Sequence, residues 1–302
     1  DGDLLIDDGG VVGSRTELPA LGAGTAQEGS TNGRLVVDGA RPADYFVGHW
    51  VEVTAPDGTL RGFGRLASIG PWLAGWALQL EALDGSPLAV APGDAWQGLY
   101  LFDDVTLRGT LRIDSAAPIV AMDHQSIAAV AFLDRVEAGS LTIEPGAVVR
   151  HLNGRDLSIH VAGMVTIEDG GAIDVTGRGY ARDTTYPGQT VAPNSAGGSH
   201  LGVGGLASST AKATYGSVYR PQEAGGGGGS SSGKSGGGVL RLLSGSLTLG
   251  GPGAAIRANG VAPTSSSSRG AAGGSVWSTT GTVSGDGLIE AVGSRSNSGA
   301  RG

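Results

Sequence analysis

A short pattern, Gly-x-Leu-x-Ile, recurs along this chain and constrains its fold more than any other feature. Residues 139–143 carry it as Gly-Ser-Leu-Thr-Ile, and related copies begin at Gly109, Gly163, Gly245 and, in a weaker form, Gly281. The copies at Gly139, Gly163, Gly245 and Gly281 are each followed by a glycine-containing turn and a second alternating stretch. Alternation of apolar and polar residues is typical of β-strands. Each unit is therefore predicted to be a strand, a turn and a second strand.

The spacing of the copies predicts how these units stack. Successive repeat glycines are separated by 30, 24, 82 and 36 residues. A coil of two or three strands with its turns needs about two dozen residues, because a strand has about five. Spacings of 24 and 30 fit single coils of a repeat architecture, in which each coil needs its neighbours for stability. The spacing of 82 predicts a large insertion.

These units predict an all-β fold, a parallel β-helix (solenoid). Alternation places one set of side chains inside the coils, namely Leu141, Ile143, Val165, Ile167, Leu247 and Leu249. It leaves Thr142, Thr166 and Thr248 outside. Residues 126–138 have some helical character, but their alignment with the repeat predicts a strand.

Residues 34–99 lack the repeat and contain four of the five Trp residues. Residues 49–54 alternate, and Pro56-Asp57-Gly58 is a strong turn signal. We predict a small, Trp-rich antiparallel β-module here, inserted before or within the first coil. Residues 1–33 are predicted to be that first coil or a cap, and residues 100–302 the β-helix, with a long Gly/Ser/Tyr-rich loop inserted at 177–238.

The long insertion is a candidate binding region, since loops of this length tend to be functional or disordered. Its candidate ligand-binding residues are Tyr180, Tyr186, His200, Tyr215 and Tyr219. Tyr rings either pack against a sugar face or cover a flank of the solenoid, and covering is the simpler interpretation. Trp72 and Trp76 are the corresponding candidates in the Trp-rich module.

Several glycine-rich stretches carry a family resemblance. Gly177-Arg178-Gly179-Tyr180, residues 197–205, Tyr215 to Pro221, the glycine run and residues 237–242 together resemble Gly-rich parallel β-helix segments of very large bacterial-type secreted or cell-surface, adhesin-like proteins. The resemblance covers residues 100–302. It implies a right-handed β-helix outside the cell with a structural or adhesive role, and it implies no catalytic residues.

Composition narrows the classes of partner. The net charge of −8 argues against general nucleic-acid binding, which requires a basic surface. No stretch is long and apolar enough to predict membrane insertion. The chain has no cysteine, which excludes disulfides and thiolate metal sites and permits secretion. We expect a segment of a longer, secreted or surface protein, partnered by other copies, by neighbouring domains of the same protein or by polysaccharide.

Acidic residues raise two further possibilities. Asp1, Asp3, Asp7 and Asp8 are candidate Ca²⁺ ligands, although Asp beside Gly more often serves turn chemistry, and no cofactor is expected. Glycoside hydrolysis needs two carboxylates that flank the scissile bond. Candidates on adjacent coils are Glu144, Glu168, Asp169 and Asp174. Glu144 and Glu168 occupy equivalent turn positions, however, as a polar ladder would.

Three functions therefore remain open. The first is a non-catalytic extracellular structural or adhesive solenoid segment, which is the preferred hypothesis. The second is a carbohydrate-active β-helix enzyme, either a polysaccharide lyase or a glycoside hydrolase. The third is a carbohydrate-binding module that uses the aromatic-rich regions. A groove with convergent carboxylates would favour the second hypothesis, and exposed coplanar aromatic rings would favour the third.

Overall fold

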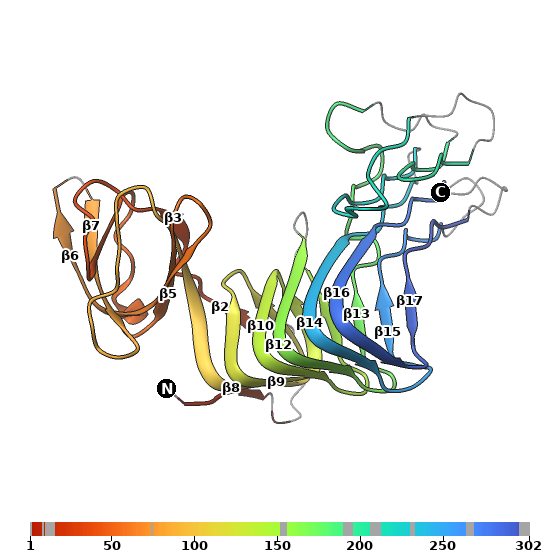
Figure 1. The fold of residues 1–302 in the computed structure, drawn as a ribbon. Coiled ribbons are helices and arrows are strands. Elements are labelled where there is room, and N and C mark those ends of the chain that lie inside the picture. Colours follow the sequence, from red (N-terminus) through yellow and green to blue (C-terminus); the bar gives the residue numbers. More distant parts are fainter. Residues whose placement is uncertain are drawn as a thin grey trace. The chain divides into compact units, whose positions relative to one another are not determined.

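The computed structural model of the chain describes residues 2–7, 9, 16–73, 75–151, 156–189, 196–205, 213–229, 233–263 and 269–295. In this part of the chain the regular secondary structure is β-strand, apart from one short 3₁₀ helix, η1 (Asp44–Phe46). Most strand pairs after residue 100 are parallel. The prediction of an all-β fold with mainly parallel strands is therefore confirmed (Figure 1).

The chain divides into two compact units. The first, which we call the Trp-rich unit, contains residues 18–102 and 115–120. The second, which we call the parallel unit, contains residues 2–17, 103–114 and 121 onward. Each unit is described by itself below.

Antiparallel pairing builds the Trp-rich unit. Its strands are β3 (Ala23–Thr25), β4 (Arg34–Val37), β5 (Trp50–Thr54), β6 (Leu60–Trp72), β7 (Gly75–Ala82) and the first part of β8 (Ala95–Ser115). Strand β5 pairs with β6 and with β8, while β7 pairs with β4 and with β6. The alternating residues 49–54 predicted β5, whose Val51 and Val53 are fully buried in the core of this unit.

Parallel pairing builds the second unit. Its strands are β1 (Leu4–Asp7), part of β2 (Thr16–Leu18), the second part of β8, β9 (Ile119–Leu133), β10 (Arg135–Ile143), β11 (Val148–Arg150), β12 (Leu157–Ile167), β13 (Ala172–Asp174), β14 (Val239–Leu249), β15 (Ala255–Arg257), β16 (Ser275–Gly285) and β17 (Leu288–Glu290). Residues 126–138 belong to β9 and β10, so the prediction of strand instead of helix is confirmed.

The repeat copies lie in register on neighbouring strands. Leu141 pairs with Val165, Val165 with Leu247, and Leu247 with Val283, along β10, β12, β14 and β16. A second series, β11, β13, β15 and β17, aligns Val149, Ile173, Ile256 and Ile289. We call these two rows of aligned apolar residues the aliphatic ladders. Although 82 residues separate Gly163 from Gly245, the chain re-enters the same register after the insertion.

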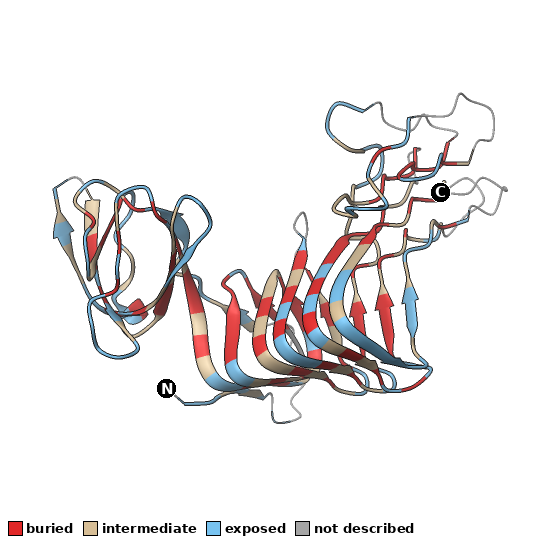
Figure 2. Cartoon of the chain, in the orientation of Figure 1, coloured by how far each residue is buried: buried red, intermediate tan, exposed pale blue. Residues whose placement is uncertain are grey.

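Burial follows the alternation that the sequence predicts. Leu141, Ile143, Val165, Ile167, Leu247 and Leu249 are all buried. The threonines between them are only partly covered, and Thr248 shares a hydrogen bond of 3.1 Å with Ser284 on the next strand. Figure 2 shows this striping along β12 and β14, and it shows that β17 is more exposed than β13 and β15.

The glycine-rich stretches are buried as well. Four segments, residues 196–200, 225–229, 236–238 and 270–274, are almost fully buried and contain no named strand. We call them the glycine layer. Backbone hydrogen bonds join them: Gly225 donates to Gly237 at 2.9 Å, and Ala272 donates to Gly226 at 3.0 Å. A Cβ atom on Gly237 would lie 1.9 Å from the carbonyl oxygen of Ala258, so only glycine permits this approach.

Candidate functional site

Four of the aromatic residues nominated in the long insertion form one cluster. The Tyr215 ring stacks on Tyr186 with centroids 5.4 Å apart and meets Tyr180 edge-on at 6.2 Å. The His200 ring lies 5.2 Å from Tyr215. Tyr219 does not join this cluster, because its side chain is 90 % exposed. The insertion therefore brings most of these residues together, at positions that no sequence periodicity specifies.

Two polar atoms of this cluster, the Tyr215 hydroxyl and His200 Nδ1, have partners within the protein. The Tyr215 hydroxyl donates to the Ala224 carbonyl at 2.9 Å, and His200 Nδ1 donates to the Gly273 carbonyl at 2.9 Å. Burial raises the pKa of Tyr215 and lowers the pKa of His200, so both side chains are neutral near pH 7. These hydrogen bonds tie the Tyr215 and His200 side chains to the glycine-rich backbone around Ala224 and Gly273.

The nominated Trp residues are covered by arginines. The Arg34 guanidinium lies 4.0 Å above the Trp72 ring, and Arg41 lies 5.5 Å from the Trp76 ring. The Trp72 Nε1 is buried and has no hydrogen-bond partner. Both Trp side chains are partly buried, so an arginine and the surrounding protein cover part of each ring.

The nominated acidic residues have structural contacts. Asp7 forms an ion pair of 2.7 Å with Arg108 and accepts a hydrogen bond from the Gly9 amide at 2.9 Å. Asp3 precedes β1, while Asp1 and Asp8 lie outside the described residues. Within the described ranges no group of three or more His, Asp or Glu side chains is arranged to hold a metal ion.

Three of the four carboxylates considered for hydrolysis have structural partners. Glu144 accepts a hydrogen bond from Ser126 at 2.5 Å, and Asp174 pairs with Arg150 at 3.3 Å. Asp169 accepts from the Gly253 amide at 2.7 Å, in the turn between β14 and β15. The amides of Glu144 and Glu168 make equivalent backbone hydrogen bonds, to Ile127 and Ile143, as the members of a ladder do.

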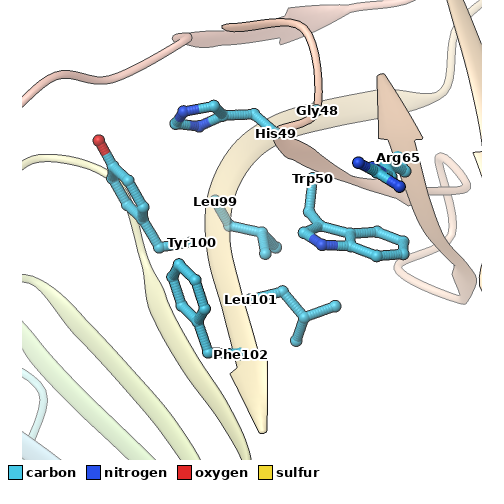
Figure 3. A pocket seen from close by; sticks show the side chains of 8 residues that line it. All are labelled: Gly48, His49, Trp50, Arg65, Leu99, Tyr100, Leu101 and Phe102. Atoms are coloured by element: carbon cyan, nitrogen blue, oxygen red, sulfur yellow. The ribbon is translucent and has the colours of Figure 1, made fainter. Parts of the chain in front are cut away.

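A pocket in the Trp-rich unit was not nominated from the sequence. Its volume is about 270 Å³, near the lower end of the range for small-molecule sites. Figure 3 shows Tyr100 and Phe102 on β8 at one side of the hollow and Trp50 with Arg65 at the other. Leu99 and Leu101 are buried at its base, in a small core that also includes Trp50.

The polar groups of this pocket are held in place. The Tyr100 hydroxyl donates to the Pro19 carbonyl at 2.6 Å, and the His49 ring lies edge-on to Tyr100 at 5.1 Å. Burial lowers the pKa of His49 and raises the pKa of Tyr100, so both are neutral near pH 7. Arg65 is exposed and supplies hydrogen-bond donors beside an aromatic wall. The pocket therefore suits a small ligand with one apolar face.

In the part of the chain that the structure describes, no helix is long and apolar enough to cross a membrane.

No protein-family model, no curated protein and no solved structure matches this sequence or fold.

Proposed function

We propose that the chain is a non-catalytic structural and adhesive segment of a larger extracellular protein or filament, built as a right-handed parallel β-solenoid. The single observation that carries this proposal is the parallel, in-register stacking of successive strand–turn–strand units from β10–β11 to β16–β17. For successive units to pair in parallel, the chain must return to the same edge of the sheet after each unit. A solenoid coil follows such a path. Right-handedness follows from the strong preference of parallel crossover connections.

The aliphatic ladders support a structural, scaffold role for the parallel unit. The two ladders keep apolar residues at equivalent positions in every unit, so each coil is stabilised mainly by the coils on either side. Such a stack can expose its loops to solvent, because no single unit needs a separate hydrophobic core. The polar, Thr- and Ser-bearing outer rows fit a surface in water, and the absence of cysteine is compatible with a location outside the cell.

Exposed apolar side chains on β16 and β17 support an assembling surface. Val283, Leu288 and Ile289 are 58 %, 42 % and 45 % exposed, whereas Leu247 and Ile256 at the equivalent positions of the preceding unit are 1 % and 0 % exposed. Among the described residues this is an apolar surface beside an open strand edge, which favours pairing with another parallel strand–turn–strand unit, from another copy or a neighbouring domain.

Self-association measured by sedimentation velocity tests this proposal. We expect the wild-type chain to associate as its concentration rises, and the variant Val283→Lys/Ile289→Lys to remain monomeric and folded, with a thermal unfolding midpoint only slightly below that of the wild type. A matched control is Thr142→Lys, which adds a charge on an outer row. Association that persists in the end variant would contradict an assembling end. A robust polysaccharide-cleaving activity that Glu168→Ala abolishes would contradict the non-catalytic part of the proposal.

A second candidate function is carbohydrate binding by the Trp-rich unit. The observation that favours it is the pocket in which Trp50, Tyr100 and Phe102 surround a hollow beside Arg65. Titration with monosaccharides, followed by chemical-shift changes of the indole NH groups, tests this candidate. We expect Phe102→Ala to abolish a saturable response, and a lack of response in the wild-type protein would rule the candidate out.

A further inference from the structure

A groove lies on the outward face of the long parallel strands, apart from every residue considered above as a ligand. Its volume is about 350 Å³, and it is lined by side chains of β10, β12, β14 and β16. The polar and aromatic members are Glu137, His160, Arg241 and Trp277. Trp277 is the one Trp residue outside the 34–99 region.

The register of the strands organises this groove into two rows. Arg135, Ser158, Arg241 and Trp277 are aligned on successive strands, which defines the first row. Glu137, His160, Leu243 and Thr279 are aligned in the same way, which defines the second row. Because neighbouring strands lie about 4.8 Å apart, the groove presents a new pair of side chains at that interval. Such a surface suits a ligand that is itself a chain of repeating units.

The charges in the groove are paired within the protein. Arg135 Nε donates to Glu137 at 2.7 Å, and Arg241 pairs with Asp156 at 3.3 Å. Two arginines and two carboxylates leave no net charge, so the groove has no electrostatic preference for an anionic or a cationic polymer. The lining residues Arg241 and Glu137 are held in place by their partners, and a guanidinium and a carboxylate can each make several hydrogen bonds, including bonds to hydroxyl groups.

Apolar surface lies beside these polar groups. Trp277 is partly exposed at one end of the first row, and Leu243 is 45 % exposed in the second row. An aromatic ring next to fixed donors and acceptors matches a molecule with an apolar ring face and polar edges. Sugar rings in a polysaccharide have this character.

From these features we propose that the groove binds a neutral polysaccharide chain that runs across β10, β12, β14 and β16 and stacks a sugar ring on Trp277. This site goes beyond the structural function, because it does not depend on association through the last unit. It is also distinct from the pocket of the Trp-rich unit. It gives the adhesive role a class of ligand, a polymer of uncharged sugars.

Isothermal titration with neutral hexasaccharides tests this site, with cellohexaose, maltohexaose and laminarihexaose as probes and polygalacturonate as the anionic comparison. We expect at least one neutral probe to bind with an affinity that is the same at low and high salt, since no charge pairing is involved. Trp277→Ala should weaken that binding by at least about ten-fold, and Trp277→Phe should retain most of it.

Two matched controls separate this site from the alternatives. Ser278→Ala changes the next residue of β16, which does not line the groove, and should alter the affinity by less than about two-fold. Phe102→Ala removes a wall of the other pocket and should leave hexasaccharide binding unchanged. The proposal is overturned if no neutral probe binds, if only polygalacturonate binds, or if a correctly folded Trp277→Ala protein binds as tightly as the wild type. None of these outcomes depends on the self-association of the chain.

Discussion

The aliphatic ladders and the glycine layer fill the interior of the parallel unit in opposite ways. In the ladders, side chains such as Ile173 and Ile256 are aligned on neighbouring parallel strands and are fully buried. In the glycine layer, backbone segments lie so close that a Cβ on Gly198 would be 2.0 Å from the Gly226 carbonyl oxygen. The first region is held by apolar side chains, and the second mainly by backbone hydrogen bonds between glycine-rich segments.

Because of this difference, the ladders and the glycine layer should tolerate different amino-acid substitutions. A ladder position loses stability when its side chain becomes smaller, because a cavity opens. A position in the glycine layer loses stability when a side chain is added, because the neighbouring backbone cannot move away. Opposite substitutions should therefore destabilise the two regions.

The largest effect is expected in the ladders. Ile173→Ala should lower the free energy of unfolding by about 2–5 kcal/mol, because Ile173 is fully buried between Val149 and Ile256. Ile289→Ala, in the same ladder at the exposed end, should cost only about 0.5 kcal/mol. Urea denaturation followed by far-UV circular dichroism measures both values. Equal losses of unfolding free energy in the two variants would show that burial between neighbouring strands does not determine the contribution of a ladder residue.

The next effect is expected in the glycine layer. Gly237→Ala should lower the free energy of unfolding by about 3 kcal/mol, through the clash with the Ala258 carbonyl oxygen. Gly202→Ala is the matched control, because a Cβ at Gly202 would have no atom within 4 Å. The control should be neutral or slightly stabilising, since alanine restricts the unfolded chain. The same denaturation assay compares them, and a harmless Gly237→Ala would contradict close backbone packing.

The ladders and the glycine layer also differ in how far the sequence predicts them. The Gly-x-Leu-x-Ile pattern is local, so alternation alone identified Leu141, Val165 and Leu247 as inward residues. The contacts of Tyr215 with Tyr180 and His200 join residues from separate parts of a glycine-rich stretch. No periodicity specifies such contacts, because a glycine-rich backbone can adopt many paths.

The groove was missed although a signal for it exists. Arg241 and Trp277 are 36 residues apart, the same spacing as the repeat glycines Gly245 and Gly281. Ser158 and Arg241 are 83 residues apart, one more than the repeat spacing of 82, because the register of β12 with β14 shifts between Val161 and Met164. Extending the repeat alignment a few residues toward the N-terminus places Arg241 beside Trp277. The same extension misaligns Ser158 and Arg241 by one residue, so the full row of side chains is not visible in the sequence.

A smaller effect is expected on the pH dependence of the free energy of unfolding, and it should arise from the glycine layer and not from the ladders. Burial lowers the pKa of His200, so the folded state binds a proton less readily than the unfolded state, whose pKa is about 6.5. Stability contributed by neutral His200 is therefore complete above about pH 6.5 and is lost as the pH falls toward the folded-state pKa. The free energy of unfolding should decrease from pH 7.5 to 5.5, by at most about 1.4 kcal/mol from this residue.

The contribution of His200 can be separated from those of other groups by comparing variants. His200→Gln keeps a hydrogen-bond donor for the Gly273 carbonyl but does not titrate. Its free energy of unfolding should depend less on pH than that of the wild type. An identical pH dependence in the two proteins would mean that His200 is not held neutral by burial.

The central claim is that the chain returns to the same register after the long insertion, and a disulfide trap tests it most directly. The native chain has no cysteine, so introduced pairs report without interference. Thr166 and Thr248 are aligned neighbours on β12 and β14, at a spacing of about 4.8 Å that permits a disulfide. Thr142 and Thr248 are separated by one intervening strand and should be too far apart.

Under mild oxidation at low protein concentration, we predict that Thr166→Cys/Thr248→Cys forms an intramolecular disulfide in most molecules, seen as a faster band on a non-reducing gel and as a loss of free thiol. Thr142→Cys/Thr248→Cys should remain reduced. Efficient cross-linking of the second pair, or none in the first, would contradict the stacking of coils across the insertion.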